Sequence, residues 1–431
     1  MRIAVVGGGL AGLTAAIECA DHGADVTLYE GRSRLGGATF SFERNGLWLD
    51  NGQHVALRCC TTYLDFLRRL GVEHLLPLQR RLHVPVLRPG MRPALLSRTA
   101  LPPPLHLAVT LLRYAPLTLG ERAAAARAAT ALRRLEPDDP ALDEQTFGAW
   151  LGEHGQSANA IAALWDLIAL PTLNLPAADA SLAAACKVFR TGLFDSAGAS
   201  DIGIPAVPFQ KLHADPAAAA LERAGARVLL GTPVGHVSDL DEDAVILAVP
   251  HHAVADLAPD AVDQAALDGL GTSPIVNLHV HYDRRVLDDP LAAALDSPLQ
   301  WIFDRTSASG ATTGQLVAIS LSHAIAEIDS PVADLRARYL PELEALLPAA
   351  RGAEVLDFAV THEPRATFRV APGTARLRPG ATTPLAAVYL AGSWTDTGWP
   401  ATMESAVRSG LTAARAALAS EQRRAPAAAV A

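Results

Sequence analysis

Cysteine is scarce in this sequence, and the cysteines present follow neither the spacing of metal ligands nor that of a disulfide framework. The four are Cys19, Cys59, Cys60 and Cys186. We therefore expect no metal centre, no disulfides and a reducing, cytoplasmic setting. No uninterrupted apolar run reaches about 18 residues, so no transmembrane helix is predicted. Glycines and then Glu18 and Asp21 interrupt the N-terminal apolar run, and we expect no secretory signal there.

Positive charge is also lacking over the chain as a whole, which argues against a nucleic-acid partner. The 431 residues carry a formal net charge of −9, half of them are apolar and 19% are charged. This composition is typical of a globular protein with a large core, and the length predicts two or three domains. The charge is uneven, because residues 68–134 contain twelve arginines and only two acidic residues. Such a segment predicts either a surface for an anionic partner or solvated helix faces.

The first thirty residues predict a nucleotide-binding unit of strand, glycine-rich turn, helix and strand. Residues 3–6 and 10–20 have the apolar spacing of a strand and of a helix. The glycines of a G-x-G-x-x-G motif stand between them: Gly7, Gly9 and Gly12. They permit the tight turn, the close approach of a pyrophosphate and the packing of the helix on the sheet. We expect the helix start at Leu10 and Ala11 to bind phosphate and Glu30, at the end of the second strand, to bind ribose hydroxyls.

NAD and FAD both satisfy that motif, and the residues that follow favour FAD. Residues 30–37, EGRSRLGG, resemble the E-x-x-x-R-x-G-G extension of flavin amine oxidases and phytoene desaturases. The resemblance implies that Arg34, Gly36 and Gly37 lie along the FAD pyrophosphate. Ala38 stands where those families usually have a further arginine.

Two later segments resemble further FAD-binding parts of the same superfamily. Residues 231–237 resemble the segment in which a valine backbone, here Val234, pairs with the adenine. Residues 390–410 resemble the C-terminal flavin motif, a strand followed by a helix. The residues that this motif implies at the flavin are Gly392, Ser393, Thr402 and Met403. A helix start at the flavin N1/O2 edge would stabilise the negative charge of reduced flavin.

Four segments together resemble the hydroxysqualene dehydroxylase family, FAD-dependent proteins of bacterial hopanoid synthesis. They are residues 49–71, 244–254, 363–368 and 391–410. The resemblance implies that hydroxysqualene, an isoprenoid lipid, loses its hydroxyl and receives a hydride from reduced FAD at N5, which gives squalene. Two alternatives remain: a carotenoid-type desaturase that runs an oxidation, and a non-catalytic FAD-bound scaffold for squalene-forming enzymes.

Two features argue against an amine oxidase. That branch places aromatic rings over the flavin to hold the amine cation, and Thr402 stands at one of these positions. The only lysines are Lys187 and Lys211, which leaves few candidates for the flavin-linked lysine of many amine oxidases.

The segment LDNGQHV, residues 49–55, carries the predicted catalytic residues. Gly52 permits close backbone approach to the flavin, and Gln53 and His54 would hydrogen-bond its carbonyl groups or a water at N5. We predict that His54 donates the proton that lets the hydroxyl leave as water, with Asp50 orienting its ring. A structural role, in which His54 only satisfies buried polar groups, is the alternative.

These observations predict an α/β protein with three parts. We expect a Rossmann-like FAD-binding domain of the glutathione-reductase type, a substrate domain built on a mixed sheet, and a helical, membrane-facing subdomain. The expected ranges are 1–75, 201–270 and 376–420 for the FAD-binding domain, 76–200 for the helical region, 271–375 for the substrate sheet and 421–431 for a flexible tail.

The lipid nature of the implied substrate predicts peripheral contact with the inner face of the cell membrane. Arginines of residues 68–134 would meet anionic headgroups while the apolar residues of 105–112 enter the interface. Contact with squalene-pathway enzymes is a further expectation. The net charge argues against a nucleic-acid partner, and the sequence does not indicate the oligomeric state.

Overall fold

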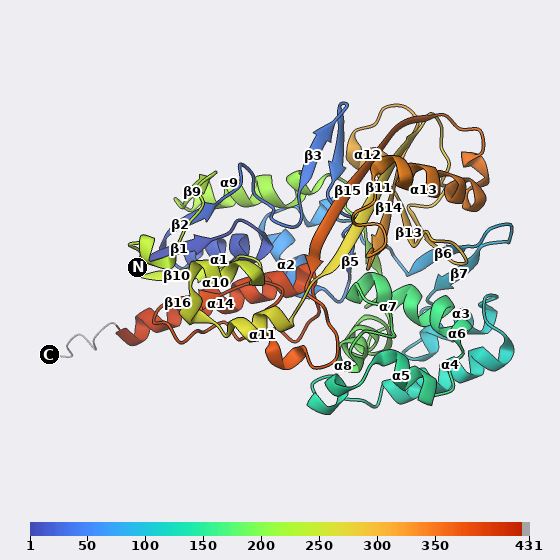
Figure 1. Ribbon diagram of the computed structural model, residues 1–431, viewed down its shortest axis with the longest axis horizontal. Helices are drawn as coiled ribbons and strands as arrows, with labels where there is room; N and C mark the ends of the chain where they lie inside the picture. The colour runs from blue at the N-terminus through green and yellow to red at the C-terminus, as the bar shows by residue number, and fades with distance from the viewer. Residues whose placement is uncertain (425–431) are drawn as a thin grey trace.

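Five parallel strands form the central sheet of the nucleotide-binding half (Figure 1). In this computed structural model, which describes residues 1–424, their order is β16-β10-β1-β2-β9. The strands are β1 (Arg2–Val6), β2 (Asp25–Glu30), β9 (Arg227–Leu230), β10 (Ala244–Leu247) and β16 (Val388–Leu390). Three stretches of chain that lie far apart in the sequence therefore build one sheet. The order agrees with the predicted Rossmann-like topology of a doubly wound sheet.

Helices cover both faces of this sheet, as parallel strands require. The helices on one face are α1 (Leu10–Asp21), α2 (Thr61–Arg69), α9 (Asp215–Arg223) and α14 (Met403–Arg424). The shorter helices on the other face include α10 (Val254–Leu257) and α11 (Gln264–Gly269). Ile3 and Val5 of β1 enter the first core, and Ala4 and Val6 enter the second. This alternation follows from the two-residue period of a strand.

The helix α1 lies so close to α14 that only a glycine fits between them. A Cβ atom on Gly410 would stand 2.3 Å from the carbonyl oxygen of Ala11. The close approach fixes the start of α14 beside the start of α1. The first and last segments of the chain thus meet at one place, as the two FAD-like motifs predict.

A second, seven-stranded sheet stands beside the first, and it is mixed as predicted. Its order is β15-β11-β14-β13-β12-β6-β7, and β12–β6 is its one parallel pair. The strands are β6 (His83–Leu87), β7 (Ala94–Ser97), β11 (Ser273–Tyr282), β12 (Leu291–Ala294), β13 (Trp301–Asp304), β14 (Gln315–Ser322) and β15 (Val355–Thr367). The helix α13 (Val332–Leu346) covers one face with Leu335, Tyr339 and Leu343. Two strands of this sheet, β6 and β7, come from the range 76–200, which the sequence assigns to a substrate and helical region.

Short helices fill the region between β7 and the second pass through the parallel sheet. They are α3 (Ala108–Arg113), α4 (Leu119–Leu132), α5 (Phe147–Glu153), α6 (Ala158–Ala160), α7 (Asp166–Leu173) and α8 (Leu182–Phe189). Side-chain oxygens cap four of them, because Thr118, Thr146, Ser157 and Ser181 each accept a hydrogen bond from a first-turn N–H. Figure 1 shows this helical region below the seven-stranded sheet.

Smaller elements join these parts. They are the strand pairs β3 (Ser41–Arg44) with β4 (Leu47–Asp50) and β5 (Ala56–Leu57) with β8 (Ile202–Gly203), and the helix α12 (Thr306–Ser309). At the C-terminal end, α14 continues into the range expected as a tail, and residues 425–431 lie outside the described residues. No helix within residues 1–424 combines the length and the apolar character needed to cross a bilayer.

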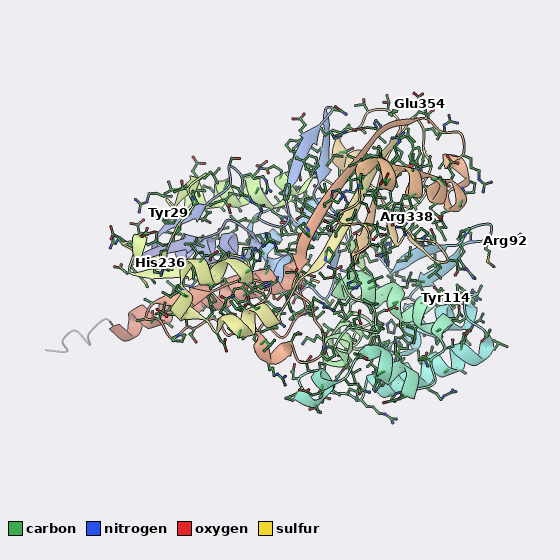
Figure 2. All side chains as sticks on the ribbon, in the orientation of Figure 1. Tyr29, Arg92, Tyr114, His236, Arg338 and Glu354 are labelled. Carbon is green, nitrogen blue, oxygen red and sulfur yellow. The ribbon has the colours of Figure 1, made fainter. Side chains whose placement is uncertain are left out.

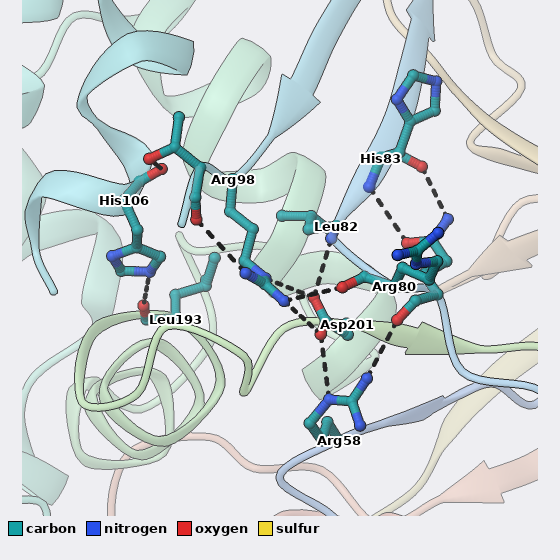
Figure 3. A network of polar contacts seen from close by, with 10 residues as sticks. Arg58, Arg80, Leu82, His83, Arg98, His106, Leu193 and Asp201 are labelled. Atoms are coloured by element: carbon teal, nitrogen blue, oxygen red, sulfur yellow. Dashed lines mark hydrogen bonds and ion pairs between the residues drawn. The ribbon is translucent and has the colours of Figure 1, made fainter. Parts of the chain in front are cut away.

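A buried carboxylate ties β7 and the loops around β5 and β8 together (Figure 3). Asp201 is fully buried and accepts hydrogen bonds from Arg98 Nε at 2.6 Å and Arg58 Nε at 3.1 Å. The backbone N–H of Leu82 donates to the same carboxylate at 2.9 Å. These bonds fix the helical region against the rest of the chain, because their donors come from three separate segments.

Candidate active site

One cavity of about 1120 Å³ runs between the two sheets and into the helical region. This volume is at the upper end of ordinary small-molecule pockets. One part of it is lined by the glycine-rich turn after β1 and the start of α14, and the other by apolar side chains. The shape therefore suits a nucleotide and a second, apolar molecule.

The glycine-rich turn has no room for side chains. A Cβ atom on Gly12 would stand 1.8 Å from the carbonyl oxygen of Gly7, and one on Gly37 would stand 2.7 Å from the Cα of Gly9. Gly7 and Gly37 have φ values of +110° and +57°, which favour glycine. The backbone at this turn is thus open to close approach by a ligand.

The carboxylate of Glu30 stabilises the turn and still faces the cavity. It accepts hydrogen bonds from the backbone N–H of Gly8 at 2.7 Å and of Arg32 at 2.8 Å. Each oxygen keeps a further lone pair for a ligand hydroxyl. Glu30 therefore holds the loop in place and remains available for the predicted ribose contact.

Most of the residues predicted to bind the cofactor line this one cavity. They are Gly7, Gly9, Leu10, Ala11, Glu30, Gly36, Gly37, Gly52, Val234, Gly392, Ser393, Thr402 and Met403. Gly12 lies beneath the turn, where it lets α1 approach the sheet. Arg34 does not line the cavity: its guanidinium stacks on the Phe40 ring, 3.3 Å from the centroid, and Arg32 faces the cavity instead. Within the described residues, Arg34 Nη1 is buried and has no hydrogen-bond partner, so the contact of Arg34 with the pyrophosphate stays a prediction.

An arginine that the sequence did not single out fixes the loop between β16 and α14. The buried Arg378 donates to the carbonyl oxygens of Ser393 at 3.1 Å and of Trp394 at 3.3 Å. Burial lowers the pKa of Arg378 to about 10, so the side chain keeps its charge at neutral pH. The loop is thereby held with Gly392 and Ser393 on the cavity wall.

The predicted catalytic Asp50 is engaged away from His54. Its carboxylate is buried and accepts from Ser41 Oγ at 2.6 Å, from Arg305 Nη2 at 2.8 Å and from the backbone N–H of Phe209 at 3.0 Å. Within residues 1–424, no hydrogen bond joins Asp50 to His54, so Asp50 does not orient the His54 ring in the predicted way. It acts on that ring only through its negative charge, which raises the pKa of His54.

His54 lines the cavity and packs edge-on against Phe209, with ring centroids 5.2 Å apart. Loss of water around the ring lowers the pKa of His54 below its ordinary value, although Asp50 and a hydrogen bond to the Ala38 backbone act in the other direction. The ring is therefore neutral at neutral pH. A neutral imidazole accepts a proton more readily than it donates one, which weakens the predicted role of His54 as the acid.

Gln53 lies between the large cavity and a small pocket beneath it. The small pocket also contains Asp50, His279 and Arg305. Within residues 1–424, neither Gln53 Nε2 nor His279 Nε2 has a hydrogen-bond partner. Gln53 therefore has an unused donor within the LDNGQHV segment, and its role as a hydrogen-bonding group stays a prediction.

The second part of the cavity is an apolar compartment. The side chains that line it include Leu107, Leu111, Tyr114, Ala125, Ala129, Ile168, Phe189, Leu193, Phe194, Leu291, Trp301 and Phe303. They come from the helical region and from the edge of the seven-stranded sheet. Such a compartment binds a hydrocarbon by excluding water, with a gain of roughly 25 cal/mol per Å² of apolar surface.

A comparison with known families decides the identity of this cavity. The model of the family described as flavin containing amine oxidoreductase matches residues 10–418. The chain belongs to this family. It is a FAD-dependent oxidoreductase, and the predicted cofactor is confirmed.

Similarity to individual members of the family covers almost the whole chain. A hydroxysqualene dehydroxylase of Sinorhizobium fredii is 27% identical and covers 97% of this chain and 98% of its own. A zeta-carotene desaturase of Zea mays is 25% identical over 95% of this chain and 82% of its own. The predicted resemblance to hydroxysqualene dehydroxylases is thus confirmed. The solved structure of a putrescine oxidase bound to putrescine shares the fold, with a TM-score of 0.74 at 18% identity over 97% of this chain and 99% of that one.

The residues that line the cavity fit FAD. The open turn at Gly7 and Gly37 would leave room for the pyrophosphate, and Glu30 would accept a hydrogen bond from a ribose hydroxyl. Met403, at the start of α14, lines the cavity, and the first turn of a helix has N–H groups without partners inside the helix. When bound, FAD supplies hydride transfer at N5.

Sequence reasoning missed a polar patch on the seven-stranded sheet. Asn277, Ser320, Ser322 and Glu363 line the cavity beside LDNGQHV. Their strands come from three separate segments, and no local motif brings them together. Alternation of polar residues on one face of each strand was the available signal.

Proposed function

We propose that this enzyme removes the hydroxyl group of hydroxysqualene and forms squalene, with reduced FAD as the hydride donor. The C–O bond would break, the oxygen would leave as water, and hydride from the flavin would form a C–H bond at the same carbon. One observation carries the proposal: a single cavity joins the FAD cradle to a long apolar compartment. The relatives named hydroxysqualene dehydroxylase, at 26–28% identity, support this choice of substrate.

The apolar lining of the site supports reductive chemistry. An allylic cation formed by loss of water would lie among apolar side chains, where few nucleophiles compete with hydride. Thr402 stands on the cavity wall where amine oxidases place an aromatic ring, so a cage for an amine cation lacks at least one wall.

Anaerobic turnover tests the reaction directly. The holoenzyme is reduced with dithionite, mixed with hydroxysqualene, and followed by the return of the oxidised-flavin absorbance and by mass spectrometry of the product. We expect one squalene for each flavin reoxidised. Reduced enzyme that leaves hydroxysqualene unchanged would exclude the proposal.

A carotenoid-type desaturation is the second candidate, because zeta-carotene desaturases match over a similar share of the chain. It would run in the opposite direction, with oxidised FAD taking hydride from a polyene. Oxidised holoenzyme mixed anaerobically with phytoene or zeta-carotene distinguishes the two. Bleaching of the flavin with these polyenes, and no reaction of reduced enzyme with hydroxysqualene, would favour the desaturase.

We also propose that the enzyme takes its lipid from an anionic membrane through the surface formed by β7, α3 and the segment between them. Four large apolar side chains are exposed there: Leu95, Leu101, Leu105 and Leu112. Leu105 is 55% exposed and also lines the cavity, so the same segment separates the apolar compartment from the outside. We call this surface the entrance surface.

Positive charge on the entrance surface is smaller than the sequence count suggests. Arg68 and Arg69 pair with acidic residues on α1, α2 and the turn after α2, and Arg98 pairs with the buried Asp201. Arg92 remains exposed at the tip of the β6–β7 hairpin, at the end of the molecule away from the C-terminus (Figure 2), and Arg113 is exposed beside Leu112. These two arginines support contact with anionic headgroups.

A further inference from the structure

The seven-stranded sheet turns a polar patch toward the cavity next to the LDNGQHV segment. In the register of β14, β11 and β15, Ser320, Asn277 and Thr361 form one cross-strand row. Ser322, Ile275 and Glu363 form the next row. Side chains two residues apart on a strand share a face, so both rows point the same way. Polar groups at the wall of an otherwise apolar compartment call for a polar group on the ligand.

The side-chain oxygen of Asn277 is an unpaired hydrogen-bond acceptor within the described part of the chain. Its side chain is fully buried and lines the cavity, and Nδ2 donates to the carbonyl oxygen of Asn51 at 3.0 Å. Within the described residues, its Oδ1 has no hydrogen-bond partner. A buried polar atom without a partner costs about 1–3 kcal/mol, so a donor on the ligand is favoured there.

Asn277 and the predicted catalytic segment meet at Gly52. A Cβ atom added to Gly52 would stand 3.2 Å from His54 Nε2 and 3.6 Å from Asn277 Nδ2. The two side chains therefore approach one point at the cavity wall. A hydroxyl held by Asn277 would lie beside His54.

Glu363 completes the patch with a carboxyl group. Its Oε1 accepts from Asn51 Nδ2 at 3.0 Å, so Asn51 connects Glu363 and Asn277 through its side chain and its backbone. Within residues 1–424, the other oxygen, Oε2, makes no hydrogen bond to protein, and Glu363 lines the cavity. A carboxyl with one fixed and one unengaged oxygen is suited to proton transfer.

We propose that Asn277 and Glu363 form the site that binds the substrate hydroxyl, with Asn277 accepting its hydrogen bond and Glu363 supplying the proton for its departure. This inference rests on the proposed reduction of an allylic alcohol. The C–O electron pair leaves with the oxygen, which takes the Glu363 proton and becomes water. The carbon receives hydride from reduced FAD, and the second proton of the reduced cofactor restores the Glu363 carboxyl. His54, neutral beside them, positions the hydroxyl.

Thr361→Val is a matched control for Asn277→Leu. Thr361 Oγ1 donates to the same Asn51 carbonyl oxygen at 2.8 Å, but Thr361 does not line the cavity. Both substitutions remove one bond to Asn51, and only Asn277→Leu removes the unpaired acceptor. If Asn277→Leu does not retain FAD, Asn277→Ala takes its place. The flavin spectrum reports dissociation constants for hydroxysqualene and for squalene.

We expect the wild type and Thr361→Val to prefer the alcohol over the hydrocarbon, and Asn277→Leu to lose roughly threefold to tenfold in alcohol affinity with unchanged squalene affinity. Two outcomes would overturn the role of Asn277. In one, Asn277→Leu and Thr361→Val lose the preference for the alcohol equally. In the other, Asn277→Leu keeps that preference in full. Wild type that converts no hydroxysqualene would instead overturn the proposed function, and this inference with it.

Glu363→Gln tests the proton separately, because glutamine keeps the acceptor for Asn51. We expect normal FAD content and alcohol affinity, with flavin reoxidation by hydroxysqualene slowed roughly 100-fold or more. His54→Gln should reduce the rate less than Glu363→Gln. Reoxidation at the wild-type rate in Glu363→Gln would exclude Glu363 as the proton source.

Discussion

The carboxylate of Glu404, in the first turn of α14, accepts a hydrogen bond from the backbone N–H of Tyr63 at 2.7 Å. It also accepts from the N–H of Thr62 at 3.2 Å and from Arg408 Nε at 2.7 Å. Glu404 is fully buried, and it caps the N-terminus of α2 from another helix. The start of α14 is thereby fixed to the segment that follows LDNGQHV.

Removal of this cap should loosen both helices. We expect Glu404→Ala to lower the free energy of unfolding by about 2 kcal/mol, since two N–H groups lose their acceptor. It should also release FAD on gel filtration, because Met403 lines the cavity next to it. Glu404→Gln, which keeps an acceptor, should lie between Ala and wild type. Glu73→Ala, which removes an exposed partner of Arg68, is the control and should change little. Equal melting temperatures for all variants would contradict the coupling.

The glycine turn makes a second prediction. Gly37→Ala places a Cβ 2.7 Å from the Cα of Gly9 at a φ of +57°. Gly23→Ala suffers similar strain at a φ of +83°, but its Cβ meets nothing within 4 Å. We expect both to lose about 1 kcal/mol of stability from backbone strain. Only Gly37→Ala should weaken FAD binding, by roughly tenfold or more in a fluorescence titration. Equal FAD affinity in the two variants would show that the cradle tolerates the added atom.

The nucleotide-binding half was predictable because its signals are local. The strand, turn and helix up to Glu30 lie within thirty residues, and the apolar period and glycine spacing act over a few residues each. The start of α14 at Met403 was predicted for the same reason. These elements reach the cavity as expected, since a helix start and a strand end fix where their backbone groups point.

The remaining contacts of the site were not predictable, because they join residues that lie far apart in the sequence. Asp50 pairs with Arg305, 255 residues away, so its engagement could not be read from LDNGQHV. Asn277 faces the cavity only because β11 pairs in register with β14 and β15. A local pattern names residue types, whereas long-range pairing decides which atoms remain free.

The buried Asp201 predicts an acid sensitivity. Burial alone would raise the pKa of Asp201, but hydrogen bonds from Arg98 and Arg58 outweigh it and lower the pKa below its usual range. The stabilisation is therefore full above the unfolded-state pKa of about 3.9 and is lost as the pH falls through the lower folded-state value. We expect Asp201→Asn to cost about 3 kcal/mol at pH 7, because it leaves two arginines without a counter-charge.

Thermal unfolding between pH 3 and pH 7 measures this effect. The difference in melting temperature between wild type and Asp201→Asn should be constant near neutrality and shrink below about pH 4. Asp288→Asn, at an exposed pair with Arg285, is the control and should follow the wild type at every pH. A difference that stays constant down to pH 3 would show that the charge of Asp201 is not what stabilises the network.

The entrance surface predicts lipid binding that depends on both apolar and basic residues. Leu112 is 68% exposed on α3, and insertion of such a side chain into a bilayer is worth about 1.5–3 kcal/mol. We therefore expect Leu112→Glu to weaken co-sedimentation with vesicles of phosphatidylglycerol and phosphatidylcholine by roughly tenfold or more. Leu230→Glu, on β9 at the opposite end of the molecule, is the control (Figure 1). Added salt should weaken wild-type binding, since it screens Arg92 and Arg113. Equal losses in Leu112→Glu and Leu230→Glu would show that the vesicles bind the protein elsewhere.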